Sequence, residues 1–243
     1  MKDTLFTVKT NRKIAKITYE MTLAGNTEGI RCGQFVNIKI DGFFLRRPIS
    51  VCNVEGNILT LIYKVVGDGT AAMAEMGEGT ELLLLTCLGN GYDTSLSGEK
   101  PLLIGGGAGV PPMFMLCREL IAKGKKPTVI LGFGATDEIF YEQEFKDLGA
   151  EVIVSTVDGS YGVKGFVTDA MTGLDYTYFY TCGPEPMLKA VYGASKTSGQ
   201  FSFEERMGCG FGACMGCSCK TITGYKRICK EGPVIGKEEI LWK

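Results

Sequence analysis

Histidine is absent from this sequence of 243 residues, and its absence narrows the possible chemistry. Without an imidazole there is no Ser–His–Asp triad, no Cys–His pair, no Rieske centre and few of the usual zinc catalytic sites. We therefore predict no catalytic side chain of the protein's own, and we expect bound cofactors to supply the chemistry.

The sequence also lacks an excess of charge of either sign and any long apolar run. Its 26 basic and 27 acidic side chains leave a net charge of −1, so no surface for nucleic acid or an anionic membrane is indicated. No segment has the roughly 18 uninterrupted apolar residues of a membrane span, and the N-terminus has no cationic stretch leading into an apolar run. We expect a soluble, cytoplasmic protein.

The hydrophobic pattern changes along the chain and predicts two domains and a small appendage. Residues 1–98 contain short β-rich runs separated by Gly, Asn and Asp (LFTVKT, KITYEMTL, QFVNIKI, ILTLIYKVV, ELLLLTC), which favour an antiparallel β-barrel. Residues 99–200 alternate apolar strands (PLLIG, TVILGF, EVIVST, YTYFYTC) with helical patterns, which predicts an α/β domain with a parallel sheet. Residues 201–243 have too little aliphatic sequence for a core, so we expect something other than hydrophobic burial to hold them.

Five of the ten cysteines are crowded between Cys209 and Cys229. The spacing Cys209-x4-Cys214-x2-Cys217, with Cys229 after eleven further residues, is that of a plant-type [2Fe–2S] cluster, and we predict these four as ligands. A four-cysteine zinc site is the alternative, although such sites usually show paired C-x2-C spacings, which are missing here. Cys219 is either a buried thiol pointing away or a substitute ligand, and the first interpretation is favoured.

Two glycine turns follow strands of the α/β domain. In LLIGGGAGVPP the backbone N–H groups before a helix that begins at Pro111 or Pro112 are placed to hold a pyrophosphate, although such turns also serve close packing of strand against helix. The turn CGPEPM follows the last strand, and the two turns should face one crevice. No cation follows TVILGF in Gly134–Glu138, which favours NADH over NADPH. The predicted nucleotide-binding residues are Gly105, Gly106, Gly107, Gly109, Cys182, Gly183 and Pro184.

Two barrel motifs suggest a flavin nucleotide. In RRPIS, Arg47 is suited to pair with a diphosphate and Ser50 to hydrogen-bond a flavin ring nitrogen, while the simpler interpretation is a surface Arg pair before a strand. In GDGT, Thr70 is a candidate N-cap for the helical pattern AAMAEM, next to N–H groups that suit a phosphate.

The order RPIS, YKVVGDGT, GGGAGVPP, CGPEPM and cysteine loop resembles the ferredoxin-reductase-like superfamily across nearly the whole chain. More narrowly, EERMGCGFGACMGCSCKT and YKRICKEGPV resemble the electron-transfer subunits of NAD-dependent, class 1B dihydroorotate dehydrogenases. The resemblance implies an FAD-binding barrel, an NAD-binding domain and a [2Fe–2S] domain. It implies FAD contacts from Arg47, Pro48, Ile49, Ser50, Ile62, Tyr63, Lys64, Gly69 and Thr70. Ile49 departs from the superfamily, in which many reductases carry Tyr, so the stacking partner of the flavin is left open.

The resemblance also implies a function and a partner. Dihydroorotate would be oxidised at the FMN of a separate catalytic subunit, in a heterotetramer of two plus two subunits that serves pyrimidine biosynthesis. Electrons would pass through the [2Fe–2S] cluster and FAD of this chain to NAD+. The alternatives are a reductase subunit of another redox complex, such as a hydrogenase or a sulfur-reducing assembly, and a zinc-stabilised binding module.

Overall fold

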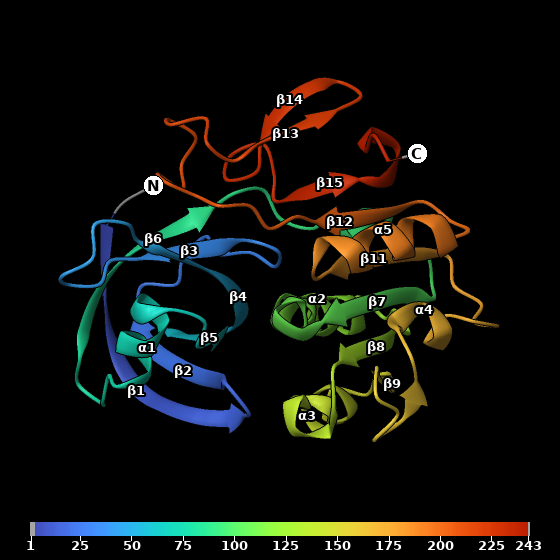
Figure 1. Ribbon diagram of the computed structural model, residues 1–243, viewed down its shortest axis with the longest axis horizontal. Helices are drawn as coiled ribbons and strands as arrows, with labels where there is room; N and C mark the ends of the chain where they lie inside the picture. Colours follow the sequence, from blue (N-terminus) through green and yellow to red (C-terminus); the bar gives the residue numbers. More distant parts are fainter. Residues whose placement is uncertain (1–2, 243) are drawn as a thin grey trace.

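The structure, a computed structural model that describes residues 3–242, places a closed antiparallel barrel at the left of Figure 1. Its strands are ordered β1, β2, β5, β4, β3, β6 around the barrel. Side chains alternate between the two faces, as in β6, where Leu82 and Leu84 are buried and Leu83 is exposed. The predicted barrel is confirmed, and its strands are β1 (Asp3–Ala15), β2 (Thr18–Gly25), β3 (Phe35–Ile38), β4 (Arg47–Glu55), β5 (Ile58–Lys64) and β6 (Glu81–Leu88).

A seven-stranded sheet forms the second unit, with the order β10, β9, β8, β7, β11, β12, β15. All neighbouring pairs are parallel except β12 with β15, so the predicted parallel sheet is confirmed and carries one antiparallel edge strand. The strands are β7 (Pro101–Gly106), β8 (Thr128–Phe133), β9 (Glu151–Thr156), β10 (Val163–Lys164), β11 (Tyr178–Cys182), β12 (Gly199–Ser202) and β15 (Val234–Gly236). The sheet runs from β7 to β8 on one side and to β11 on the other, so a ligand crevice is expected beyond the carboxyl ends of these strands.

Helices are short and lie mostly around this sheet (Figure 1). They are α2 (Pro111–Ala122), α3 (Glu142–Asp147), α4 (Val167–Ala170) and α5 (Glu185–Ala194), with α1 (Asp68–Ala74) on the barrel. Single 3₁₀ turns are Thr94–Leu96, Gly107–Gly109, Thr136–Glu138 and Lys237–Glu239. Within residues 3–242 no helix has the length and apolar character needed to cross a membrane.

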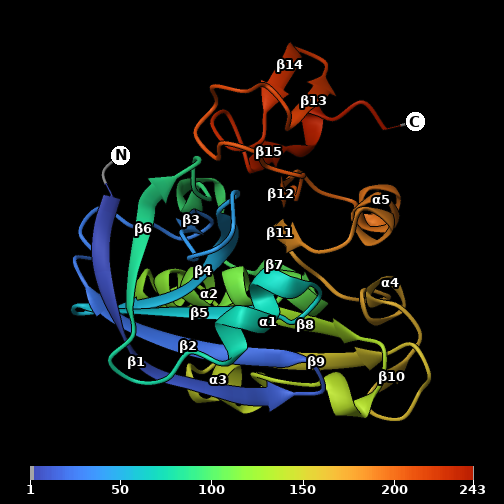
Figure 2. The same ribbon diagram turned by 60° about the vertical axis from the view of Figure 1, so that its left-hand side comes forward.

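The C-terminal segment forms a hairpin, β13 (Ser218–Thr221) and β14 (Gly224–Arg227), at the top of Figures 1 and 2. Our expectation that hydrophobic burial would not hold this segment is wrong. Phe201, Ile228 and Ile235 are buried in one apolar cluster with Phe179 of the parallel sheet. The ends of the segment, β12 and β15, are strands of that sheet, so the segment shares its core and does not need one of its own.

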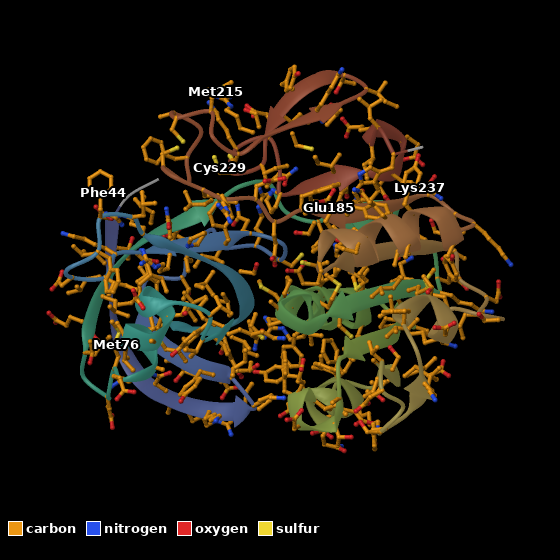
Figure 3. All side chains as sticks on the ribbon, in the orientation of Figure 1. Phe44, Met76, Glu185, Met215, Cys229 and Lys237 are labelled. Atoms are coloured by element: carbon orange, nitrogen blue, oxygen red, sulfur yellow. The ribbon has the colours of Figure 1, made fainter. Side chains whose placement is uncertain are left out.

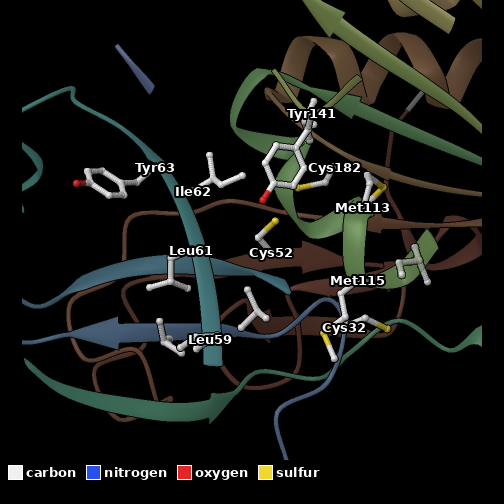
Figure 4. Packing of buried hydrophobic residues seen from close by; sticks show 14 of the residues in the cluster. Cys32, Cys52, Leu59, Leu61, Ile62, Tyr63, Met113, Met115, Tyr141 and Cys182 are labelled. Carbon is white, nitrogen blue, oxygen red and sulfur yellow. The ribbon is translucent and has the colours of Figure 1, made fainter. Parts of the chain in front are cut away.

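The barrel and the sheet share a second core, which Figure 4 shows around Cys52, Leu61 and Met113. Tyr141, just before α3, donates a hydrogen bond of 2.7 Å from its hydroxyl to Oε2 of the buried Glu20 on β2. Arg12 pairs with the other oxygen of that carboxylate at 2.8 Å. The hydrogen bond between Tyr141 and Glu20, together with the shared core, holds the sheet against the barrel and so fixes the relative positions of any groups bound to the two units.

Candidate cofactor and cluster sites

A cavity of about 390 Å³ lies between the barrel and the C-terminal segment. The barrel strands β4 and β5 bring most of the predicted flavin-binding residues to one wall of the cavity. Helix α1 adds one more of these residues, Thr70, to the same cavity. The predicted residues that line the cavity are Arg47, Pro48, Ile49, Ser50, Ile62, Tyr63, Lys64 and Thr70. Residues of two sequence motifs that lie more than a dozen positions apart, such as Arg47 and Lys64, therefore line the same cavity.

Arg47 is held in place by its surroundings. Its guanidinium lies 4.7 Å from the centre of the Phe43 ring and donates to the carbonyl of Leu45. Gly69 does not line the cavity, but a Cβ added there would lie 2.0 Å from Nε of Arg47. Gly69 thus leaves the space that this guanidinium occupies, which is a different role from direct contact with a phosphate.

Tyr63 has its hydroxyl engaged away from the cavity, because it donates to Oδ1 of Asn11 at 2.9 Å. Burial raises the pKa of this hydroxyl to about 12, so it remains protonated at neutral pH. Its ring stacks on Tyr19 with 5.9 Å between centroids. Tyr63 is therefore a rigid part of the cavity wall.

Thr70 is not the N-cap that we predicted. Helix α1 begins at Asp68 and Gly67 is the N-cap, so Thr70 occupies the third helical position. From there its Oγ1 accepts hydrogen bonds from the backbone N–H groups of Val66 and Gly67 and donates to the carbonyl of Gly67. Thr70 closes the turn before the helix, and the N-cap lies three residues earlier, at Gly67, whose backbone is extended.

Sequence reasoning missed the opposite wall of the cavity. It is formed mainly by the last residue of β12 and by residues that follow it, namely Ser202, Phe203, Glu204, Glu205 and Met207, with Ala108 and Pro233 beside them. Glu204 is exposed and lines the cavity, and desolvation by the protein atoms around it raises the pKa of its carboxyl. The sequence signal that could have identified these residues is their position just after a strand, because ligands of open α/β sheets lie beyond the carboxyl ends of the strands.

A second cavity, of about 470 Å³, lies at the carboxyl ends of β7, β8 and β11. Of the predicted nucleotide-binding residues, Gly106, Gly107 and Pro184 line it. Gly109 lies behind, where a Cβ would come within 2.1 Å of the carbonyl oxygen of Cys182. The remaining predicted residues, Gly105, Cys182 and Gly183, do not line this cavity, and Gly105 faces the backbone of Val110. The glycine turns therefore serve both the crevice and close packing, which were the two alternatives that the sequence offered.

Lys64 lines both cavities. Its Nζ lies 3.6 Å from Oε2 of Glu138, which also lines the nucleotide crevice at the end of β8. The sequence indicated no cation after TVILGF, but the fold brings this one in from the barrel. Glu138 compensates its charge, so the crevice holds a paired cation and not a free one.

The cysteine loop directs backbone N–H groups at sulfur. Cys209 Sγ accepts from the N–H groups of Phe211, Ala213 and Cys214 at 3.3–3.5 Å, and Cys217 Sγ accepts from that of Cys229 at 3.4 Å. Burial alone would raise the pKa of Cys209, but the hydrogen bonds lower it to about 6 and favour the thiolate.

Two of the four predicted ligands donate backbone N–H hydrogen bonds to the sulfurs of the other two, Cys214 to Cys209 and Cys229 to Cys217. N–H groups directed at ligand sulfurs are among the features that tune [2Fe–2S] clusters. Within residues 3–242, no three His, Cys, Asp or Glu side chains are arranged around the position of a single metal ion. The spacing of the four cysteines and the N–H groups directed at their sulfurs fit a [2Fe–2S] cluster.

Cys219 lies apart from the four. It lines a separate hollow of about 200 Å³ together with Glu204, Glu205 and Trp242. Burial, followed by the charges of Glu205 and Glu185, raises the pKa of its thiol. Its place in this separate hollow is what distinguishes Cys219, since burial also raises the pKa of Cys229, to about 12.

Comparison with known proteins follows the same division of the chain. Residues 204–241 match the iron–sulfur cluster binding domain of dihydroorotate dehydrogenase B, and residues 103–192 match the oxidoreductase NAD-binding domain. The chain is 48% identical over 245 residues to the electron transfer subunit of dihydroorotate dehydrogenase B (NAD(+)) of Fusobacterium nucleatum, covering 94% of each chain. Its identity to the subunit of the same name from Bacillus pumilus is 42% over 255 residues, covering 99% of this chain and 98% of the other.

Solved structures show the same architecture. An NADH-dependent reduced ferredoxin–NADP oxidoreductase, studied for flavin-based electron bifurcation, superposes with a TM-score of 0.89 at 27% identity, over 98% of this chain and 90% of that one. A ferredoxin NADP+ reductase from Neisseria gonorrhoeae, solved with bound FAD and NADP, has a TM-score of 0.67 at 17% identity, over 80% of this chain and 90% of that one. The second likeness concerns the fold alone.

Proposed function

Because the chain belongs to the family of electron-transfer subunits of NAD-dependent dihydroorotate dehydrogenase B, we propose that it carries electrons from a separate, FMN-containing catalytic subunit to NAD+. It is an NAD-linked oxidoreductase subunit whose cofactors are FAD, a [2Fe–2S] cluster and NAD. When bound, FAD exchanges hydride with NAD and single electrons with the cluster. The observation that carries the proposal is the cysteine loop with backbone N–H groups directed at its sulfurs, next to a cavity lined by the flavin motifs.

The protein's own residues would bind and orient these groups. We propose that Arg47 pairs with the FAD diphosphate, that Ser50 hydrogen-bonds the flavin ring, and that the other cavity residues of β4 and β5 shape its pocket. Cys209, Cys214, Cys217 and Cys229 would ligate the cluster. The domain boundaries that we propose stay at residues 1–98, 99–200 and 201–243, and strand β12 crosses the second of them.

For the nucleotide, we propose that Gly106, Gly107 and Pro184 line its pyrophosphate and nicotinamide path, while Gly105, Gly109, Cys182 and Gly183 hold the turns that form it. Glu138 supports a preference for NADH, because it pairs with Lys64 and so makes that cation less available to a 2′-phosphate. We propose that the protein is cytoplasmic, because none of its ten cysteines, all within the described residues, forms a disulfide, and a reducing compartment preserves thiols and thiolate ligands.

The catalytic partner would dock on the face that carries the cysteine loop. Met215, within the cysteine loop, is 54% exposed, and Phe44, between β3 and β4, is fully exposed; both are labelled in the upper left part of Figure 3, as is Cys229. Both apolar side chains are available to a partner. We propose that two copies of this chain and two catalytic subunits form the complex.

Reconstitution tests this function. Mixing the purified chain with the candidate FMN subunit should create dihydroorotate:NAD+ activity that neither protein has by itself. If the chain alone reduces NAD+ with dihydroorotate, or if the fully loaded mixture is inactive, the partner assignment fails. A visible spectrum checks the cofactors beforehand, because a colourless, zinc-loaded protein would point to a binding module.

A further inference from the structure

Strand β3 separates the barrel core from the C-terminal segment, and its side chains alternate accordingly. Val36 and Ile38 belong to the barrel core, whereas Phe35 belongs to the apolar cluster that contains Cys217 and Cys229. Asn37 lies on the same face of the strand as Phe35, because residues two apart share a face. This outer face of β3 is therefore covered by the segment that carries the cysteine loop.

Asn37 makes a contact that joins the two regions directly. Its side-chain Nδ2 donates to the backbone carbonyl of Cys209 at 3.3 Å, across 172 positions of sequence. The residue is 1% exposed, and its Oδ1 is buried with no hydrogen-bond partner among the described residues. A buried amide that uses only part of its hydrogen-bonding capacity is costly, so its presence calls for a specific reason.

The neighbouring loop residue is fitted to this amide. Gly210 has φ +77°, and a Cβ there would lie 2.4 Å from Nδ2 of Asn37. Any other L-residue at this position would meet both the strained backbone conformation and the side chain of Asn37. Two independent features of the chain, the amide and the glycine, thus hold the start of the cysteine loop against β3.

The same face of this strand segment also borders the flavin cavity. Asn37 is paired with Pro48 of β4 in the strand register, and both Pro48 and Phe35 line that cavity. The hydrogen bond to Cys209 is thus one strand removed from the residues assigned to FAD. Among the described residues, no hydrogen bond joins the glycine turns of the nucleotide crevice to Cys209.

We propose that Asn37 is a positioning residue that fixes the first cluster cysteine against the flavin barrel, so that it sets the environment of the cluster and its coupling to the flavin cavity. The inference rests on the proposed function, since it requires the [2Fe–2S] cluster. Hydrogen bonding and solvent exposure around the ligands tune the reduction potential of such clusters, and residues just outside the ligand set alter metal-site properties about 10- to 100-fold.

The test uses the full chain with its cofactors and the substitution Asn37→Leu, which removes the donor at similar size. We expect a displaced cluster midpoint potential, a changed EPR signal of the reduced protein, and about tenfold slower bleaching of the cluster absorption by NADH. FAD content and NADH:ferricyanide activity, which need only the flavin half, should be retained. Asn37→Asp, which keeps the shape and loses the donor, should act in the same direction and replaces Asn37→Leu if that variant does not fold.

The matched control is Asn53→Leu. Asn53 lies on β4 of the same barrel and also has a buried Oδ1 without a partner, but it makes no described hydrogen bond to the cysteine loop. Wild-type potential and bleaching rate in the Asn37 variants, or equal changes in Asn53→Leu, would overturn the inference. A wild-type chain without any cluster signal would overturn the proposed function, which separates the two failures.

Discussion

Replacing Arg47 by Ala should weaken FAD binding, and the adjacent Arg46 provides a matched control. Arg47 lines the flavin cavity, with its guanidinium set by the Phe43 ring and the Leu45 carbonyl. Arg46 does not line it and pairs instead with Asp3 at 2.7 Å. The two substitutions remove the same charge from neighbouring positions, so only the role in the cavity differs.

The expected magnitude follows from the kind of contact that is lost. A hydrogen bond to a charged group contributes about 1.5–3 kcal/mol, and each 1.4 kcal/mol corresponds to a factor of ten in Kd. Arg47→Ala should therefore raise the Kd for FAD about 10- to 150-fold. Arg46→Ala removes a partly exposed ion pair, of a kind that contributes about 1 kcal/mol or less to stability, and should leave FAD affinity unchanged.

The assay is titration of the apoprotein with FAD, followed by the quenching of flavin fluorescence. Thermal unfolding of both apoproteins is measured in parallel, because a general loss of fold would also reduce FAD content. If Arg47→Ala binds FAD as tightly as the wild type, or if both variants lose FAD equally, the guanidinium is a surface charge and the diphosphate must be held elsewhere.

Three further predictions test other parts of the molecule. Cys217→Ser should abolish or strongly alter the EPR signal of the reduced cluster while Cys219→Ser preserves it, and the reverse result would show that the ligands are misassigned. Tyr141→Phe leaves an oxygen of the buried Glu20 without its donor and should lower the free energy of unfolding in urea by about 1–3 kcal/mol, whereas Tyr161→Phe, whose hydroxyl bond is exposed, should change it by about 0.5 kcal/mol or less. In diaphorase assays, kcat/KM should be higher with NADH than with NADPH. Equal or better use of NADPH would contradict the role proposed for Glu138, in the turn that follows β8.

Local patterns in the sequence determined the types of element and the order of the units. Alternating apolar residues predicted the barrel strands, and apolar runs ending in glycine predicted the parallel sheet, because side-chain periodicity and backbone freedom are properties of neighbouring residues. The spacing of Cys209, Cys214 and Cys217 indicated the cluster for the same reason, since a short loop has few ways to present three thiolates. One local prediction was wrong: Thr70 is not the N-cap of α1. The N-cap is Gly67, because the start of a helix also depends on the path by which the chain enters it.

Only the tertiary structure decided which distant residues meet. It placed Glu204 opposite the flavin motifs, brought Lys64 from the barrel into the nucleotide crevice, and set Asn37 against Cys209. It also joined β12 and β15 to the parallel sheet, so that Phe201 shares a core with residues well before it in the chain. Such meetings depend on strand order and on the packing of one unit against another, and these are set by the sum of many weak, non-directional contacts that leave no short-range pattern in the sequence.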